Sequence, residues 1–386
     1  MEESKIAIVT IQRVKNYGAA LQAYALQTTL FKLNYLNEIL DYKRDIKKNK
    51  LVKSKYGYTG LLLVFAIEKL KQLRRYILNV IAFKDIRLKK LNGINDIFEN
   101  FDKTFLIYSK KQYLESNLAE SNKHYVGFVC GSDQVWNHNF DFSIDAFFLN
   151  FVEKGKRKIA FAPSFGIEDV PKSLHEKYQK SFNDFDFLSV REAEGAKILN
   201  EITGHNVPVL LDPIFLLSKN DWIENFSIKT QNNRKPFILC YTLGKEDEIA
   251  LEICRKIASE NDYDVVRLGR GRDDVKLNDL IVEWSVGPIE FLELIYNSKL
   301  VVTNSFHGTA FSINFNIPFF CVLSKKNKRT SRINNILRVF NLEERIVYEY
   351  DKSIHLKLNL KDPSTINDII LKEREKALEY LNKALV

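Results

Sequence analysis

Residues Leu300 to Phe311 are Leu-Val-Val-Thr-Asn-Ser-Phe-His-Gly-Thr-Ala-Phe, and this stretch decides the fold. Its first four residues form an apolar, β-branched run, which predicts a buried strand at 300–303. Polar Asn304 and Ser305 follow, and a helix is expected from about His307. A buried strand that leads directly into a helix is the repeating element of βαβ units, in which helices connect parallel strands.

The same alternation recurs along the chain and divides it into two series. Strands of the first series are expected at 6–11, 38–42, 126–130, 158–162, 187–190 and 207–211, with a helix at 18–33. After a polar stretch at 229–235, a second series has strands at 237–242, 264–268, 300–303 and 318–323, and helices at 246–259, after Pro288 and from about His307. The pattern predicts an α/β fold with two Rossmann-like domains facing a cleft, at 1–228 and 236–363, and a C-terminal helix at 364–386.

The stretch at about 53–105 does not follow this alternation. Lysines and arginines are distributed there among Ile, Leu and Phe, which predicts a basic, amphipathic helical insertion in the first domain. Two interpretations stay open. The apolar face packs on the first sheet, or the basic surface makes a peripheral contact with an anionic membrane.

Composition narrows the class of protein. The net charge of +9 favours an anionic partner, but no recognisable nucleic-acid-binding module is present, so nucleic acid is not expected. The four cysteines are far apart and lack metal-ligand spacing, which predicts reduced thiols and no metal site. A polar N-terminus and the absence of a long apolar run favour a cytoplasmic location. The glycine patterns of dinucleotide- and P-loop sites are missing, so no bound cofactor is expected.

His307 is the strongest candidate for chemistry. In open α/β sheets, ligands bind beyond the carboxyl ends of strands, which here are the loops after Ile11, Cys130, Val190, Leu268 and Thr303. The turn that contains His307 lies at such a strand end and begins a helix, where backbone N–H groups and the helix dipole suit an anion. The imidazole of His307 can transfer a proton near neutral pH, so a catalytic role is favoured over a purely structural one.

Other strand ends also carry polar residues. Arg191 begins a helix after the strand at 187–190, where its guanidinium either binds an anion or pairs with neighbouring glutamates. Asp133 and Trp136 follow the strand at 126–130, and a carboxylate next to an aromatic ring is typical of sugar sites. The loop at 269–272 and the basic run at 325–332 are interpreted as solvated, although Arg332 lies close enough in sequence to a helix start to reach the cleft.

Several of these segments together resemble the polysaccharide pyruvyltransferase family. The resemblance covers most of the chain and rests on separate motifs in a fixed order: Asn16-Tyr-Gly-Ala-Ala-Leu-Gln-Ala-Tyr-Ala-Leu, Gly131-Ser-Asp-Gln-Val-Trp-Asn, Phe161-Ala-Pro-Ser-Phe-Gly, Ser189-Val-Arg-Glu, Asp212-Pro, Thr303-Asn-Ser-Phe-His-Gly-Thr and Ser331-Arg-Ile. It implies a fold like that of GT-B glycosyltransferases. It also implies transfer of the enolpyruvyl group of phosphoenolpyruvate, as a co-substrate, onto two sugar hydroxyls, which gives a pyruvate ketal and phosphate.

The resemblance also assigns roles to residues. The family's histidine corresponds to His307 as general acid, and its basic donor-binding residues correspond to Arg191 and Arg332. Ser305, Gly308 and Thr309 complete the expected donor site. The sequence departs from some relatives in having Ser305 where they carry an arginine, which makes the donor site less basic.

The acceptor is expected against the first domain, near Asn16, Tyr17, Gly18, Asp133 and Trp136. It is expected to be a sugar or a lipid-linked oligosaccharide of capsule or exopolysaccharide biosynthesis, handled at the inner face of the cell membrane if the basic insertion binds there. Two alternatives stay open: a nucleotide-sugar-dependent GT-B glycosyltransferase and a non-catalytic glycan-binding protein.

Overall fold

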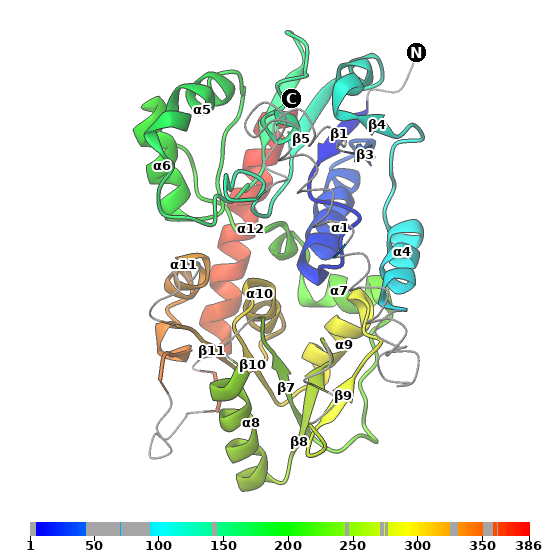
Figure 1. Ribbon diagram of the computed structural model, residues 1–386, viewed down its shortest axis with the longest axis vertical. Helices are drawn as coiled ribbons and strands as arrows, with labels where there is room; N and C mark the ends of the chain where they lie inside the picture. The colour runs from blue at the N-terminus through cyan, green and yellow to red at the C-terminus, as the bar shows by residue number, and fades with distance from the viewer. Residues whose placement is uncertain are drawn as a thin grey trace.

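The computed structural model describes residues 5–43, 70, 93–140, 145–243, 247–270, 274, 277–324, 331–349, 358–360 and 362–386. Its two larger parallel sheets lie one above the other, each flanked by helices (Figure 1). The expected insertion at about 53–105 falls largely outside the described residues. Its last part is a helix, α4 (Ile94–Phe105), which buries Phe98 and Phe101 and therefore packs on the protein with its apolar side.

The first domain contains a four-stranded sheet in the order β2-β1-β5-β6. Its strands are β1 (Ile6–Val9), β2 (Asn37–Ile39), β5 (Gly127–Cys130) and β6 (Arg157–Ala160), and β3 (Tyr42–Lys43) pairs separately with β4 (Tyr113–Leu114). Its helices are α1 (Tyr17–Lys32), α5 (His175–Phe182), α6 (Ala193–Thr203) and α7 (Lys219–Phe226), with short 3-10 turns at Glu115–Lys123, Asp145–Phe148, Lys172–Leu174 and Pro213–Leu216.

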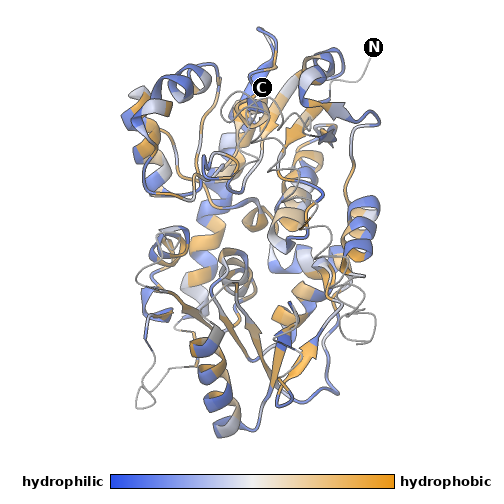
Figure 2. Cartoon of the chain, viewed as in Figure 1, coloured by the Kyte–Doolittle hydropathy of each residue, from blue (hydrophilic) through white to orange (hydrophobic). Residues whose placement is uncertain are grey.

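The second domain contains a six-stranded sheet in the order β12-β11-β10-β7-β8-β9. Its strands are β7 (Phe237–Tyr241), β8 (Asp264–Leu268), β9 (Ile281–Glu283), β10 (Leu300–Thr303), β11 (Phe319–Val322) and β12 (Ile346–Val347). The helices are α8 (Asp247–Asn261), α9 (Pro288–Asn297), α10 (Phe306–Phe315) and α11 (Ser331–Val339), with a 3-10 turn at Glu343–Arg345. β7, β10 and β11 are buried along their whole length, as parallel strands covered on both faces must be, and Figure 2 shows hydrophobic residues along them.

Two expected strands of the first domain are not strands. Residues 187–190 and 207–211 make only isolated bridges, Phe187 with Ile159 and Val190 with Val209. Pro208 lies in the second segment and lacks the N–H that a longer ladder requires, although its carbonyl accepts from the Val190 N–H. The apolar runs there are buried in the core of the domain without belonging to a sheet.

The C-terminal helix α12 (Pro363–Leu385) connects the two domains. It starts beside the second domain, where Asn316 donates to Asn367, and runs up to the first, where the Tyr380 hydroxyl donates to the Ala160 carbonyl (Figure 1). One hydrophobic cluster includes residues of both domains, among them Leu21, Phe215, Phe291 and Ile336. The two domains are therefore held together by apolar packing.

Candidate active site

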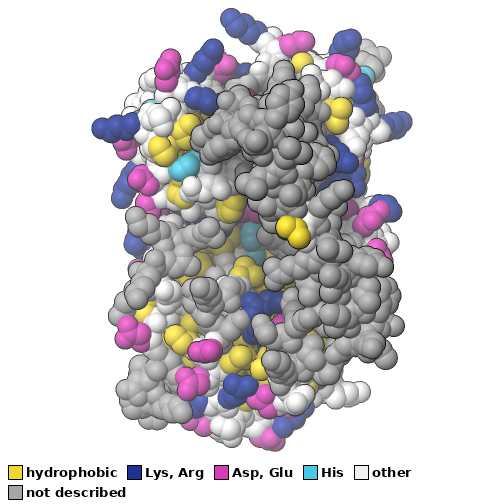
Figure 3. Space-filling view, viewed as in Figure 1, with side chains coloured by type: hydrophobic (Ala, Val, Ile, Leu, Met, Phe, Trp, Pro, Cys, Tyr) yellow, Lys and Arg dark blue, Asp and Glu magenta, His cyan; other side chains and the backbone are white. Residues whose placement is uncertain are grey.

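A cavity of about 790 Å³ lies between the two domains. Figure 3 shows the molecule hollowed at mid-height, with basic side chains gathered there. Most of its lining comes from the loops at the carboxyl ends of β1, β5, β7, β8 and β10 and from the starts of α10 and α11. The lining residues with polar side chains are Lys15, Asn16, Tyr17, Asp133, Gln134, Tyr241, Arg270, Asn304, Ser305, His307 and Arg332. Four of the five loops predicted to bind ligands contribute residues to this lining, whereas the loop after Val190 does not.

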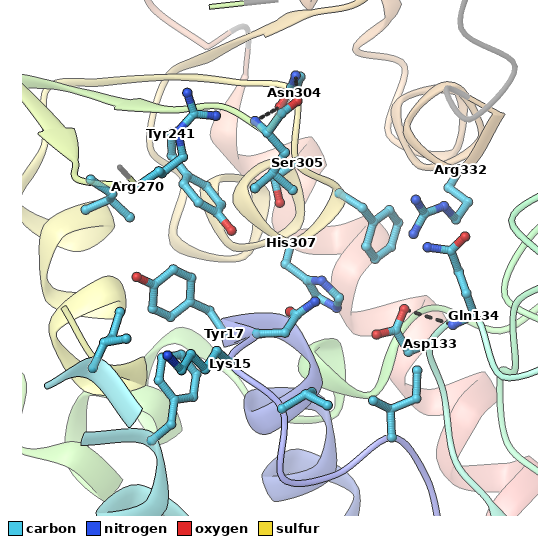
Figure 4. A pocket seen from close by; sticks show the side chains of 18 of the residues that line it. Lys15, Tyr17, Asp133, Gln134, Tyr241, Arg270, Asn304, Ser305, His307 and Arg332 are labelled. Atoms are coloured by element: carbon cyan, nitrogen blue, oxygen red, sulfur yellow. Dashed lines mark hydrogen bonds between the residues drawn. The ribbon is translucent and has the colours of Figure 1, made fainter. Parts of the chain in front are cut away.

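His307 lies in the first turn of α10 and faces the middle of this cavity (Figure 4). Ser305 caps the helix, because its hydroxyl accepts from the Gly308 N–H at 3.3 Å. Only 7% of His307 is exposed, and its Nε2 atom is 3.5 Å from Oδ2 of Asp212. Nε2 makes no hydrogen bond within the described residues. A buried ring nitrogen of this kind is suited to a ligand atom or a transferred proton.

The His307 ring lies directly against the backbone of Gly18. A Cβ atom at position 18 would be 1.9 Å from Nδ1 and 2.1 Å from Cγ of the imidazole. Only glycine leaves room for the ring, so Gly18 provides the surface on which the His307 ring packs, which we call its seat. Gly18 itself does not line the cavity. Gly18 belongs to α1 of the first domain and His307 to α10 of the second.

Behind the imidazole is a buried charge cluster. Nη1 of Arg191 donates to Oδ2 of Asp212 at 2.6 Å, and Nη2 lies 3.7 Å from Oδ1 of Asp133. Burial opposes ionisation of Asp212, but charge attraction from His307 and Arg191, together with the hydrogen bond from Arg191, outweighs it and holds the Asp212 pKa well below its usual range. The carboxylate is thus ionised and faces the imidazole.

Arg191 does not occupy the position that the sequence predicted. Its side chain is 2% exposed, does not line the cavity and lies 4.3 Å from the ring centre of Phe306. Three nearby carboxylates, of Asp212, Asp133 and Glu192, retain the guanidinium behind the site. Arg191 therefore pairs with carboxylates, which was the alternative to the prediction that it binds the donor directly.

The two ends of the cavity both carry cations. At one end is Arg332, whose guanidinium lies 5.9 Å from the Phe306 ring and beside Gln134 and Asp133 (Figure 4). At the other end, Figure 4 places Arg270 beyond Tyr241 and Lys15 beside Tyr17, with the two tyrosines between these cations.

The tyrosines at this second end are held by the second domain. Tyr17 stacks on Phe291 with ring centres 4.5 Å apart, and its hydroxyl donates to the Val286 carbonyl at 3.2 Å. Burial raises the pKa of Tyr241 to about 12, so its hydroxyl is neutral and available for hydrogen bonding.

The remaining predicted residues are placed as follows. Asn16 and Asp133 line the cavity, and the Asn16 side chain also caps α1 by accepting from the Ala19 N–H. Thr309 is fully buried and bonds to the Ser305 carbonyl, and Gly308 packs against Thr303, whose Oγ1 would lie 2.6 Å from an added Cβ. Neither Thr309 nor Gly308 lines the cavity, so the prediction that these two residues contact the donor directly is wrong.

Trp136 is also a core residue and does not offer a ring face to a sugar. It is 0% exposed and packs among Phe148, Phe165 and Phe182, and its indole N–H donates to the Phe147 carbonyl. Asp133 and Gln134, shortly before it in sequence, line the cavity, whereas the indole turns inward.

Several cavity residues were missed by the sequence interpretation. Tyr241 ends β7, Asn304 follows β10, Lys15 directly precedes the predicted acceptor residues in the loop after Ile11, and Arg270 lies in a loop that had been interpreted as solvated. Their positions beyond strand ends are the signal that could have found them. Asp212 had been quoted only as part of a motif, and its role depends on the distant partners Arg191 and His307.

In the part of the chain that the structure describes, no group of three or more His, Cys, Asp or Glu side chains is arranged to hold a metal ion. No helix among the described residues is both long and apolar enough to cross a membrane.

Comparison with known proteins gives a family and a fold. The family model described as polysaccharide pyruvyl transferase matches residues 16–326. A solved UDP-N-acetylglucosamine 2-epimerase is similar in structure, with a TM-score of 0.52 and 11% identity over 99% of this chain and 96% of its own. No curated protein sequence matches significantly.

Two other solved structures align more loosely. A putative UDP-N-acetylglucosamine 2-epimerase from Listeria monocytogenes has a TM-score of 0.47 at 11% identity over 100% of this chain and 90% of its own. The E. coli ADP-heptose lps heptosyltransferase II has a TM-score of 0.39 at 12% identity over 99% of this chain and 98% of its own. The predicted GT-B-like fold of two Rossmann-like domains is confirmed.

Proposed function

Because the chain belongs to the polysaccharide pyruvyl transferase family, we propose that it transfers the enolpyruvyl group of phosphoenolpyruvate to two hydroxyls of a sugar. The product is a cyclic pyruvate ketal, and phosphate is released. The observation that supports this most directly is His307, seated on Gly18, backed by ionised Asp212 and facing a cavity with cationic ends.

The donor binds at the Arg332 end of the cavity. Phosphoenolpyruvate carries a carboxylate and a phosphate, and a guanidinium can bind either group in bidentate fashion. The first turn of α10 begins between the two ends of the cavity, where its backbone N–H groups add further donors for an anion. Arg191 supports this end from behind, because its guanidinium packs on Phe306 and holds Asp212.

His307 acts first as an acid and then as a base. The charged imidazole gives its proton to the methylene carbon of the donor while one acceptor hydroxyl attacks C2, so a C–H bond and a C–O bond form and the double bond is lost. The neutral imidazole then takes the proton of that hydroxyl. The second hydroxyl attacks C2, the C–O bond to phosphate breaks, and phosphate leaves with the remaining proton. Positioned acid catalysis of this kind contributes about 10²–10⁴-fold in rate.

Asp212 holds the imidazole in place for both steps. Its carboxylate faces Nε2 at 3.5 Å and orients the ring. The acceptor lies between Asn16, Tyr17 and Asp133 on the first-domain side of the cavity, within reach of His307. We propose a sugar or lipid-linked oligosaccharide of capsule or exopolysaccharide synthesis as this acceptor, no tightly bound cofactor, and action in the cytoplasm or at the inner membrane face.

The test is a reaction with phosphoenolpyruvate and a panel of free, nucleotide-linked and lipid-linked sugars, with product mass and released phosphate measured together. We expect the pyruvate ketal mass and stoichiometric phosphate in one arm of the panel. The variant His307→Gln should lose at least about 100-fold in kcat while its thermal unfolding is unchanged. Sugar transfer from a nucleotide sugar without phosphoenolpyruvate would instead establish a glycosyltransferase. Binding of glycan without turnover would establish a non-catalytic protein.

A further inference from the structure

Gln134 lies at the Arg332 end of the cavity and contacts Arg332 across the boundary between the domains. A guanidinium carries only N–H donors, so the amide of Gln134 turns its oxygen toward Arg332. In that orientation the oxygen accepts from Nη1 of Arg332 at 3.1 Å and from Nη2 at 3.2 Å. Figure 4 shows the two side chains facing each other. The contact uses only part of the guanidinium fork, so it can fix the plane of the group while the fork still donates to an anion.

The backbone of Gln134 is held in a tight turn after β5. Asp133 has a left-handed backbone with φ of +78°, and its Oδ1 accepts from the Gln134 N–H at 2.8 Å. Residues other than glycine adopt this conformation uncommonly, and such outliers concentrate at functional sites. The Asp133 carbonyl accepts from the Ser164 N–H at 2.8 Å, which attaches the turn to the segment at 163–166.

Gly166, in that segment, leaves the space that the Gln134 side chain occupies. A Cβ atom at position 166 would lie 2.1 Å from one terminal amide atom of Gln134 and 2.7 Å from its Cδ. Buried Glu192 holds the segment, because its Oε1 accepts from the Ser164 hydroxyl at 2.8 Å, the Phe165 N–H at 2.8 Å and the Gly166 N–H at 3.1 Å. The amide therefore packs on a fixed turn, which limits the positions it can take.

Arg332 reaches this contact on a helix that meets the first domain at a second point. Asn335, one turn later in α11, accepts at Oδ1 from the N–H of Ala193, the first residue of α6, at 3.2 Å. Positions three residues apart share a helix face, so the face of α11 that carries Arg332 lies against the first domain. The partner that the first domain offers at Gln134 is a neutral amide, which adds no negative charge of its own.

We propose that Gln134 is the positioning residue of Arg332 and orients its guanidinium toward phosphoenolpyruvate without neutralising its charge. This inference rests on the proposed function, because it places phosphoenolpyruvate at Arg332. Bidentate binding of a carboxylate or phosphate requires a guanidinium of fixed plane, and an amide oxygen can fix that plane while the full positive charge stays available. Because Gln134 and Arg332 belong to different domains, the anion site is complete only while α11 is docked on the first domain.

The test measures the Kd of phosphoenolpyruvate by calorimetry, with thermal unfolding as the measure of folding. Gln134→Leu removes the amide oxygen, whereas Gln134→Glu keeps an oxygen toward Arg332 and adds a negative charge. Both variants should weaken phosphoenolpyruvate binding by roughly tenfold or more, as expected for loss of a charge-assisted hydrogen bond, and leave the KM for the acceptor unchanged. A purely structural role predicts the opposite for Gln134→Glu, because an Arg–carboxylate pair would hold the helix at least as well and preserve the Kd.

A double-mutant cycle separates positioning from direct contact, which is necessary because Gln134 itself lines the cavity. In the Arg332→Gln background, Gln134→Leu should weaken phosphoenolpyruvate binding by less than about twofold, since the amide acts through the guanidinium. A further loss of about tenfold in that background would overturn the inference and make Gln134 a direct ligand of phosphoenolpyruvate.

Gly166→Ala tests the same contact from the other side of the amide. The added Cβ would displace Gln134, so phosphoenolpyruvate binding should weaken by roughly tenfold. The matched control is Gly204→Ala, because Gly166 and Gly204 both have left-handed backbones, with φ of +61° and +76°, but an added Cβ at position 204 meets nothing within 4 Å. The control should share the fall in Tm that backbone strain causes and keep the Kd within about twofold. Equal Kd values in the two alanine variants would contradict the proposal.

Failure of the proposed function looks different. In that case the wild-type protein does not bind phosphoenolpyruvate, and the same variants are measured with inorganic phosphate, which a guanidinium also binds. Phosphate binding that depends on Arg332, and on Gln134 only while Arg332 is present, would retain the positioning role without the proposed reaction. Phosphate binding that depends on neither residue, or no phosphate binding at all, would overturn it.

Discussion

Adding one methyl group at Gly18 should inactivate the protein without unfolding it. The Cβ of Gly18→Ala would lie 1.9 Å from Nδ1 of His307, so the ring must retreat by about 1.5 Å to reach ordinary van der Waals contact. A displacement of about 1 Å in a reacting group can cost on the order of 100-fold in rate. Gly18 has no left-handed backbone and lies in the first turn of α1, where alanine is otherwise a favourable helix residue.

The expected result is therefore a kcat lower by on the order of 100-fold, with a cost in stability of about 1–3 kcal/mol for overpacking, partly offset by helix propensity. Phosphate release from phosphoenolpyruvate with acceptor measures kcat, and thermal unfolding measures stability. Gly195→Ala is the matched control, because Gly195 also lies in a first helical turn and its added Cβ would be 3.2 Å from Phe165, far less crowded than the contact at Gly18. A folded Gly18→Ala protein with kcat within about threefold of wild type would refute the claim that this seat positions the catalytic group.

Three further outcomes follow from the structure. Asp212→Asn should lower kcat at least about tenfold. Because the Asp212 pKa is depressed in the folded protein, the stability that its carboxylate contributes is lost as pH falls below about 4. The free energy of unfolding should therefore fall less steeply with acid in the variant than in the wild type. Burial raises the pKa of Asp102 to about 6, so the folded protein favours the neutral carboxyl, and the stability associated with that neutral form is complete below about pH 4 and is lost as pH rises through 6. Asp102→Asn should therefore stabilise the protein by on the order of 1–2 kcal/mol at pH 7.5 and not at pH 4, as measured by denaturant unfolding. Trp136→Phe should destabilise the protein by roughly 1–3 kcal/mol, measured by denaturant unfolding, and leave the KM for the acceptor unchanged. A higher KM would indicate that Trp136 contacts the sugar after all.

The parts of the fold that the sequence predicts well are those decided by local patterns. The apolar run at Leu300 predicts β10, the polar residues after it predict the start of α10, and His307 lies where the two meet. Both determinants, burial of a short strand and capping by Ser305, depend on residues a few positions apart. The shorter strands β9 and β12 were not predicted, because three- and two-residue strands carry too few side chains to show a period.

The direction in which a polar side chain points was harder to predict. Arg191 and Arg332 both lie at helix starts near strand ends, yet only Arg332 lines the cavity. The difference arises from Asp212 and Asp133, which are distant in sequence and retain Arg191 behind the site. Trp136 shows the same limit, since the aromatic rings that bury it come from segments that its sequence neighbours do not reveal.

The proposed catalytic arrangement exists only while the two domains are in contact. His307 belongs to the second domain, but Gly18, on which its ring packs, and Asp212, whose carboxylate faces it, belong to the first. Moving the domains apart by a few ångströms would remove both from the imidazole at once, because neither the packing contact nor the ion pair tolerates such a gap. The apolar contact of Tyr17 with Phe291 and the course of α12 along both domains oppose that separation. Contacts far from the reacting atoms, such as Tyr17 on Phe291, are therefore expected to control kcat through the position of one imidazole.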